Sequence, residues 1–433
     1  MRPRVLIPVV LVVLAAAAWW VLRGTGPGDV PASVTTDDRS AILPKGPRSD
    51  FLAARSIGDA IRANERPMIS NVGLFDLDGD ALTDIVVCDA GRNEVAWIRQ
   101  FPAGVFTESR VAEVAAAAHA EAIDMDGDGD RDLLVASLGQ LLPSNNRIGS
   151  VVILENDGAQ RFTSREVVSG IARVADARAG DLDGDGDLDI AVAGFGYDSG
   201  ETLWLENMGG WRFEPHVLLR LSGPINAIVA DVNQDGHLDI VTLVSQEWEQ
   251  LWAFVNDGRG NFKAVQIWGS TNPDYGSSWI SMADLDADGD ADIVYSNGDA
   301  FDYAPANSRP WHGVQWLQNN GNLQFAFHRI ADISGASSPQ AADLDGDGDL
   351  DVVVVSAFNN WDDPASQSLM WLENNGRQQF TLHDVANTPS HLITLAVGDL
   401  EGTGRANLVT GGMHLSRPFD RMSRVTLWSP LER

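Results

Sequence analysis

Residues 181–192 have the sequence Asp181-Leu-Asp183-Gly-Asp185-Gly-Asp-Leu-Asp189-Ile-Ala-Val192. Acidic side chains occupy the first, third, fifth and ninth positions, glycines lie between them, and a β-branched, apolar run follows. Three or four carboxylates within nine residues repel one another, so a folded chain needs a hard cation at this point. The segment therefore predicts a cation-binding loop that leads directly into a β-strand.

The same pattern recurs along the whole chain. It starts again at Asp76, Asp124, Asp231, Asp284 and Asp343, and an eroded seventh copy starts at Asp399. The intervals range from 48 residues (76 to 124) to 59 residues (284 to 343). A repeat of this length is typical of propeller blades with four strands each. Seven copies predict one domain of seven blades.

Each repeat also has a consistent second half. Small residues such as Ala177-Arg-Ala179 precede the acidic loop and suit a crowded innermost strand. After the β-branched strand comes a segment such as Trp204-Leu-Glu-Asn207-Met-Gly209, and a Phe follows the Asn by six residues. Asn-Gly and Asp-Gly pairs favour positive φ angles and predict tight two-residue hairpin turns. The repeat thus supplies four antiparallel strands.

The two ends of the chain complement each other. The last repeat ends at residues 425–428 without a Phe strand, whereas residues 51–57 resemble a Phe strand that precedes the first repeat. We expect residues 49–58 to complete the seventh blade, which would remove an exposed sheet edge. The predicted fold is all-β: a seven-bladed β-propeller of four-stranded antiparallel blades, its ring closed by an N-terminal strand in the last blade.

The N-terminus has a different character. Arg2 and Arg4 precede an uncharged apolar run over residues 5–22, which contains Trp19 and Trp20. This pattern predicts a single transmembrane anchor, or a signal peptide cleaved near Ala16-Ala17-Ala18. The predicted domains are residues 1–22 as anchor or signal segment, 23–48 as flexible linker and 49–433 as propeller. We then expect an exported protein, periplasmic or at the cell surface, tethered to the membrane or secreted.

Charge and cysteine content exclude some functions. The formal net charge is −31, and no Lys/Arg cluster occurs in the repeats, so a nucleic-acid partner is not expected. The single cysteine, Cys88, follows a β-branched run and is expected to be a buried thiol.

The acidic loops are similar to those of FG-GAP/VCBS β-propeller repeats, as in integrin α-subunits and exported bacterial proteins. An EF-hand is excluded because position twelve is never acidic, as at Val192, and strands flank the loop. The resemblance implies Ca²⁺ rather than Mg²⁺, at about six structural sites, held by positions one, three, five and nine and a backbone carbonyl at position seven. The implied side-chain ligands are Asp76, Asp78, Asp80 and Asp84; Asp124, Asp126, Asp128 and Asp132; Asp181, Asp183, Asp185 and Asp189; Asp231, Asn233, Asp235 and Asp239; Asp284, Asp286, Asp288 and Asp292; and Asp343, Asp345, Asp347 and Asp351. The first loop departs from the pattern at Ala81, where glycine is usual.

Function is expected on the opposite face, where long loops follow the β-branched strands. Candidate ligand-binding residues there are Trp248, Asp299, Asp302, Tyr303, Trp311, His312, Asn360, Trp361, Asp362, His414 and Arg417. One hypothesis is a binding module for a glycan, peptide or protein. The alternative is a carbohydrate-active enzyme of lyase or dehydratase type, in which His312 or His414 pairs with an Asp. Each His could instead be a loop residue with local hydrogen bonds.

Overall fold

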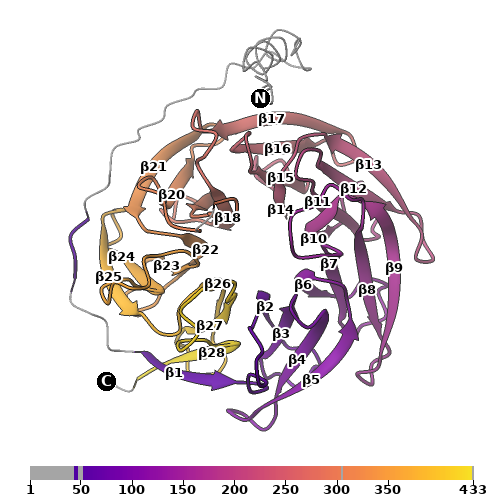
Figure 1. Cartoon of the computed structure of the whole chain (residues 1–433). Coiled ribbons are helices and arrows are strands. Elements are labelled where there is room, and N and C mark those ends of the chain that lie inside the picture. Colours follow the sequence, from indigo (N-terminus) through magenta and orange to yellow (C-terminus); the bar gives the residue numbers. More distant parts are fainter. Residues whose placement is uncertain (1–42, 47–51, 304–305, 432–433) are drawn as a thin grey trace, which may run out of the picture. The chain divides into compact units, whose positions relative to one another are not determined.

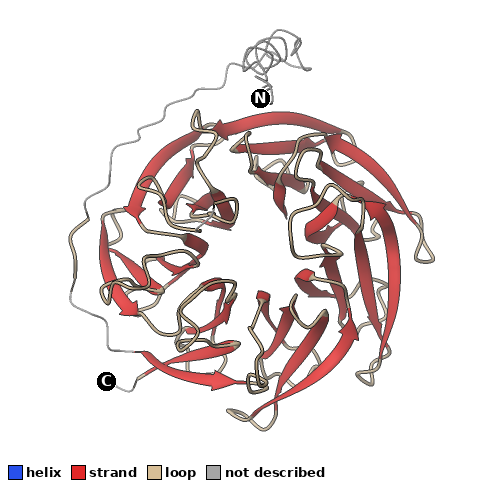
Figure 2. Cartoon of the chain, in the orientation of Figure 1, coloured by secondary structure: helices blue, strands red, loops and turns tan. Residues whose placement is uncertain are grey.

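A computed structural model describes residues 43–46, 52–303 and 306–431. These residues form 28 β-strands and no helix, grouped into seven four-stranded antiparallel sheets arranged as blades around a central axis (Figures 1 and 2). The predicted seven-bladed propeller is confirmed. In each blade the first strand after the previous blade is innermost, and the chain then moves outward strand by strand, except that β1 is the outermost strand of blade seven.

The strand bounds follow the repeats. Blade one has β2 (Ile69–Phe75), β3 (Asp84–Asp89), β4 (Glu94–Gln100) and β5 (Phe106–Glu113); blade two has β6 (Ala117–Ile123), β7 (Asp132–Ser137), β8 (Gly149–Asn156) and β9 (Phe162–Ile171); blade three has β10 (Arg173–Gly180), β11 (Asp189–Phe195), β12 (Glu201–Asn207) and β13 (Phe213–Leu219). Blade four has β14 (Pro224–Ala230), β15 (Asp239–Val244), β16 (Gln250–Asn256) and β17 (Phe262–Gly269); blade five has β18 (Ser277–Ala283), β19 (Asp292–Asn297), β20 (Gly313–Asn319) and β21 (Phe325–Asp332). Blade six has β22 (Ala336–Ala342), β23 (Asp351–Ser356), β24 (Leu369–Asn374) and β25 (Phe380–Ala386), and blade seven has β26 (Leu392–Gly398), β27 (Asn407–Gly412) and β28 (Val425–Pro430) with β1 (Leu52–Ile57).

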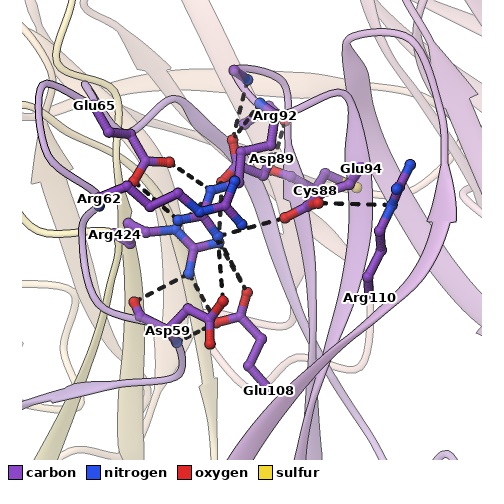
Figure 3. A network of polar contacts seen from close by, with 12 residues as sticks. Asp59, Arg62, Glu65, Cys88, Asp89, Arg92, Glu94, Glu108, Arg110 and Arg424 are labelled. Atoms are coloured by element: carbon purple, nitrogen blue, oxygen red, sulfur yellow. Dashed lines mark hydrogen bonds and ion pairs between the residues drawn. The ribbon is translucent and has the colours of Figure 1, made fainter.

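The ring closes as the sequence predicts. Strand β1 pairs antiparallel with β28, from Leu52 opposite Pro430 to Ile57 opposite Val425. In Figure 1 the indigo β1 lies beside the yellow β28. A second closure element is polar: Arg424, directly before β28, contacts Asp89 and Glu108 of blade one (Figure 3). Because the ends of the chain share one blade, no strand of that blade is left without its partner.

The hydrophobic core lies between neighbouring blades. Side chains alternate across each central strand, so Ile85 and Val87 of β3 pack with blade seven, whereas Val86 and Cys88 pack with blade two. Cys88 is a buried free thiol, as expected, and burial raises its pKa. The β-branched strands therefore serve two blade interfaces each, which explains why they are apolar on both faces.

The hairpin prediction is partly wrong. The glycines after the Trp strands do adopt positive φ, for example Gly209 at 72°. The turn, however, has five residues rather than two, because Asn207 ends β12, Phe213 begins β13 and residues 208–212 lie between them. The turn is closed by a backbone bond, in which Met208 N donates to Arg212 O at 2.8 Å, and the Asn207 side chain is held separately because its Nδ2 donates to Leu188 O at 3.1 Å.

The N-terminal predictions need correction. Within residues 43–46, 52–303 and 306–431 no helix is long and apolar enough to cross a membrane. The apolar run over residues 5–22 lies outside the described residues. The predictions of a membrane anchor and of an exported protein are withdrawn. Part of the predicted flexible linker, residues 23–48, is paired instead: Gly46 N donates to Leu382 O at 2.9 Å, and Lys45 forms an ion pair with Asp384.

Candidate functional site

The acidic loops connect the first and second strands of each blade and share one internal geometry. The aspartate at position one folds the loop around itself. Asp124 Oδ1 accepts the N–H of Gly127 at 2.8 Å, and its Oδ2 accepts the N–H of Gly129 at 3.0 Å. Gly127 and Gly129 have φ of 76° and 99°, a conformation that costs glycine little. The loop is thus shaped by its backbone before any ion is considered.

The aspartate at position nine is a buried structural residue as well as a candidate ligand. Asp132 is 1% exposed; its Oδ2 accepts the N–H of Met125 at 3.0 Å, and its Oδ1 accepts the N–H of Asn156 at 2.8 Å. Burial raises the pKa of Asp132 to about 6, although these two hydrogen bonds act in the opposite direction. Position nine therefore ties the acidic loop to the third strand of the blade.

In the first and fifth loops the aspartate at position three has an oxygen atom without a hydrogen-bond partner. Oδ1 of Asp78 and Oδ1 of Asp286 are buried and have no hydrogen-bond partner. A buried carboxylate oxygen without a donor is costly unless a cation is present. Carboxylate oxygens from the same loop lie within 4.8 Å of one another in five groups: Asp76, Asp78 and Asp84; Asp124, Asp126 and Asp132; Asp181, Asp183 and Asp189; Asp284, Asp286 and Asp292; and Asp343, Asp345 and Asp347. This all-oxygen donor set fits a hard divalent cation.

Two loops fit less well. In the fourth loop Asn233 Nδ2 donates to Asp235 Oδ2 at 2.9 Å, so the amide and the carboxylate engage each other. In the seventh loop Asn407 replaces the position-nine aspartate, and its Oδ1 accepts the N–H of Leu400 at 2.9 Å. Among the described residues, neither loop forms a group of three convergent carboxylates.

In the first loop a positively charged side chain, that of Arg99, contacts the carboxylates. Arg99 Nη2 lies 2.5 Å from Asp78 Oδ2 and 3.4 Å from Asp80 Oδ2. The corresponding residue of blade five is Gln318, whose Nε2 donates to Asp286 Oδ2 at 2.6 Å. Ala81, the departure noted in the sequence, adopts φ 67° and so keeps the shape that glycine has elsewhere. The difference of this loop therefore lies in Arg99 rather than in Ala81.

The long-loop face is the surface formed by the loops between the second and third strands of the blades, at the opposite end of the strands from the acidic loops. Several predicted ligand-binding residues on this face are buried: His312 is 1% exposed, His414 0% and Trp361 8%. Arg309 N donates to His312 Nδ1, and Ser423 N donates to His414 Nε2. Burial lowers the pKa of both imidazoles to about 4. These side chains support their own loops.

Other residues that were predicted to bind a ligand have local partners or are exposed to solvent. Trp248 Nε1 donates to Ser222 Oγ at 3.0 Å, and Trp311 Nε1 donates to Asp274 O at 2.8 Å. The guanidinium of Arg309 lies over the ring of Tyr303 at 3.5 Å. Asp299 is half-buried, and burial raises its pKa to about 6. The exposed members of the predicted set are Asp302, Asn360, Asp362 and Arg417.

The acid–base pair of the enzyme hypothesis is not assembled. Within the part of the chain that the structure describes, no hydrogen bond or ion pair joins His312 or His414 to Asp299, Asp302 or Asp362. General acid–base chemistry needs such groups within reach of one substrate. The geometry therefore gives this hypothesis no support.

A hollow that the sequence did not predict lies at the central mouth of the long-loop face. Its volume is about 340 Å³, and every blade contributes to its lining. Apolar loop residues such as Leu142, Phe301 and Phe358 form much of it. The only sequence signal was the presence of large apolar residues in loops that are otherwise polar.

Comparison with known proteins agrees with this geometry. The model of the FG-GAP-like repeat matches residues 76–135, 124–192, 181–242, 231–295 and 302–354. The first four matches begin at the first aspartate of an acidic loop. No curated protein is detectably similar to the chain in sequence.

Solved structures are similar to this chain at low sequence identity. BBS1N, crystallised in complex with ARL6DN, is 11% identical, with a TM-score of 0.50 over 85% of this chain and 94% of that chain. The V. cholerae biofilm matrix protein Bap1 is 12% identical, with a TM-score of 0.44 over 88% of this chain and 92% of that chain. At 11% identity the likeness to BBS1N concerns the fold alone.

Proposed function

The chain belongs to the FG-GAP/VCBS-repeat β-propeller family, and on this premise we propose that it is a calcium-stabilised binding module. The ligand is a glycan, a peptide or a protein, and it binds to the long-loop face. The observation that supports this proposal is the hollow at the central mouth of the long-loop face, to which all seven blades contribute. Ligand sites occur preferentially in concave, mainly apolar surfaces with a few polar groups.

Calcium has a structural role in this proposal. The groups at positions one, three and nine would hold the ion in the first, second, third and fifth loops, and those at positions one, three and five would hold it in the sixth. Bound Ca²⁺ supplies positive charge that cancels the repulsion between the carboxylates. The unpartnered Oδ1 of Asp286 supports this assignment in the fifth loop, whereas Arg99 already lies beside Asp78 in the first loop.

The long-loop face also supplies exposed polar groups, of which Asp302 lines the hollow. Asp302, Asn360, Asp362 and Arg417 are exposed on loops of blades five, six and seven. Binding residues are often found on such loops when a rigid scaffold positions them. The buried His312, Trp361 and His414 hold these loops in place, so we assign them a supporting role rather than ligand contact.

The test is a screen of the full chain, in calcium, against glycan and peptide arrays. A double variant, Asn360→Ala with Asp362→Ala, is expected to lose most binding to any hit, because it removes exposed polar groups of the long-loop face. The matched control is Asp157→Ala, an exposed aspartate in the outer hairpin turn of blade two. Hits that depend on Asp157 and not on Asn360 and Asp362 would contradict the assignment of the long-loop face.

A further inference from the structure

The floor of the hollow is built by a repeated backbone irregularity. In six innermost strands the pairing with the second strand skips one residue near the start: Ser70, Ala118, Ala175, Ile225, Ser278 and Ile393. A β-bulge of this kind leaves one residue unpaired and re-aims its side chain. All six skipped residues line the hollow. The propeller thus places one small or apolar side chain from each of six blades in the floor of the hollow.

The hydroxyl groups in this floor are already engaged. Ser278 Oγ donates to Ala336 O at 2.8 Å, and Ser337 Oγ donates to Ile393 O at 2.8 Å. Ser70 Oγ lies 3.1 Å from Cys88 O. Because these groups bond to the backbone of their own or the next blade, the floor offers a ligand mainly carbon surface.

The walls are apolar as well. Leu142 is 67% exposed and Phe301 43% exposed, and both line the hollow. The ring of Phe301 packs edge-on against Phe358, with centroids 4.7 Å apart. Large apolar side chains left in water at a concave site favour an apolar occupant, because its binding removes their surface from water.

The charge around the hollow is negative on one side. Asp302 lines it, and Gln246 Nε2 lies 3.4 Å from Asp302 Oδ2. The negative charge of Asp302, together with burial and the charges of Asp198 and Glu247 on the neighbouring loops, raises the pKa of Tyr197. The cation in the lining, Arg173, is 4% exposed and donates to Gln140 O and Leu141 O, so it is committed to its own loop.

We propose that the hollow binds a small amphiphilic amine. The apolar part of the amine packs against Leu142 and Phe301 and rests on the bulge residues that form the floor. Its ammonium group lies beside Asp302. The volume of about 340 Å³ fits one small molecule. The proposal rests on the proposed function only in assuming that the long-loop face binds ligands, and it adds a small-molecule site in the hollow to that face.

The experiment is calorimetric titration of the full chain, in calcium, with three probes that share an indole body. Tryptamine is cationic, tryptophol neutral and indole-3-acetate anionic at neutral pH. We expect tryptamine to bind with one-to-one stoichiometry, tryptophol about tenfold more weakly, as for one charge contact near a protein surface, and indole-3-acetate not detectably. Equal affinity for the three probes would overturn the proposal.

Two variants locate the site. Asp302→Asn should remove the preference for tryptamine over tryptophol and leave the affinity for tryptophol unchanged. Leu142→Ala should weaken the binding of both probes. This variant is not expected to misfold, because the Leu142 side chain is highly exposed. The controls are Asp157→Asn and Met208→Ala, an exposed acid and an exposed apolar residue on outer hairpin turns. Unchanged tryptamine affinity in Asp302→Asn and Leu142→Ala overturns the proposal.

Failure of this proposal is separable from failure of the proposed function. Array ligands that depend on Asn360 and Asp362, together with no binding of tryptamine, would refute the amine site and leave the binding module intact. Tryptamine binding that depends on Asp302, with no array ligand that depends on Asn360 and Asp362, would support the amine site and restrict the function of this face to small molecules.

Discussion

Arg424 and Glu108 form a buried bidentate ion pair across the seam where the ring closes. Arg424 Nη1 donates to Glu108 Oε2 at 2.8 Å, and Nη2 donates to Glu108 Oε1 at 2.9 Å. Their side chains are 1% and 3% exposed. Burial alone would raise the pKa of Glu108, but the hydrogen bonds and charge of Arg424 outweigh it and lower that pKa. Asp89 accepts a further hydrogen bond from Arg424, so the seam holds two anions against this guanidinium (Figure 3).

Replacing Arg424 with Met should destabilise the fold strongly. The change leaves Glu108 and Asp89 buried without the guanidinium, and breaking a buried pair in this way costs about 3–5 kcal/mol. The measurement is the free energy of unfolding in urea. Arg110→Met is the control, because the Arg110 side chain is 51% exposed and an exposed pair contributes about 0–1 kcal/mol. Equal effects of the two variants would mean that the seam pair is unimportant.

The seam also illustrates what the sequence could and could not predict. Strand exchange between the two ends could be predicted because the last repeat lacks a Phe strand, whereas residues 51–57 resemble a Phe strand that belongs to no repeat. A missing strand can be recognised when the other copies of the repeat contain it. The pairing of Arg424 with Glu108 did not follow, because the two residues are far apart in sequence and neither belongs to the repeated motif. The bulge residues Ser70 and Ile225 were equally hidden, because a register shift leaves no mark in composition.

The predicted ligand face shows a second limit. Trp, His and Asp in long loops suggested a polar surface, but these loops are long enough to pack on themselves. His312 and His414 are therefore buried and accept backbone N–H groups. Loop sequence alone does not distinguish a side chain that holds the loop from one that faces solvent.

Removal of calcium should lower the melting temperature. For each occupied loop, calcium at a hundredfold excess over its Kd adds about 2.7 kcal/mol to the stability. Thermal melts with EDTA and after calcium is restored measure the effect, and Mg²⁺ should restore less because it prefers a smaller octahedral shell. Asp286→Asn should reduce the calcium-dependent part of the stability by the share of one loop. An identical melt with and without EDTA would refute a structural role of calcium.

Arg99→Gln should strengthen calcium binding by the first loop. The guanidinium of Arg99 lies 2.5 Å from Asp78 Oδ2 and repels a divalent cation there, whereas the glutamine would resemble Gln318 in blade five. We expect the variant to bind about one more calcium ion per chain at limiting concentrations, as measured by calorimetry or native mass spectrometry. Arg161→Gln, on an exposed outer turn, is the control. Unchanged stoichiometry and affinity would show that Arg99 does not compete with the ion.

Glu249 supplies a pH-dependent contribution between blades four and five. It is 2% exposed; its Oε1 accepts the N–H of Gly276 at 2.9 Å, and its Oε2 accepts the N–H of Ser277 at 2.9 Å. Burial raises the pKa of Glu249 to about 8 from the ordinary 4.5, although these hydrogen bonds act in the opposite direction. No ion pair to Glu249 occurs in the described ranges, so no cation offsets the burial.

The raised pKa fixes the sign of the effect. Below about pH 4.5 the carboxyl is protonated in both the folded and the unfolded chain, and its contribution is fully present. Between about pH 4.5 and 8 the unfolded chain ionises while the folded chain keeps the proton, so stability falls with rising pH and levels off above 8. Wild type should therefore lose roughly 2–4 kcal/mol relative to Glu249→Gln between pH 5 and 8. Urea unfolding in calcium at several pH values measures this difference, with the exposed Glu247→Gln as control. Parallel curves for wild type and Glu249→Gln would mean that Glu249 ionises normally in the folded protein.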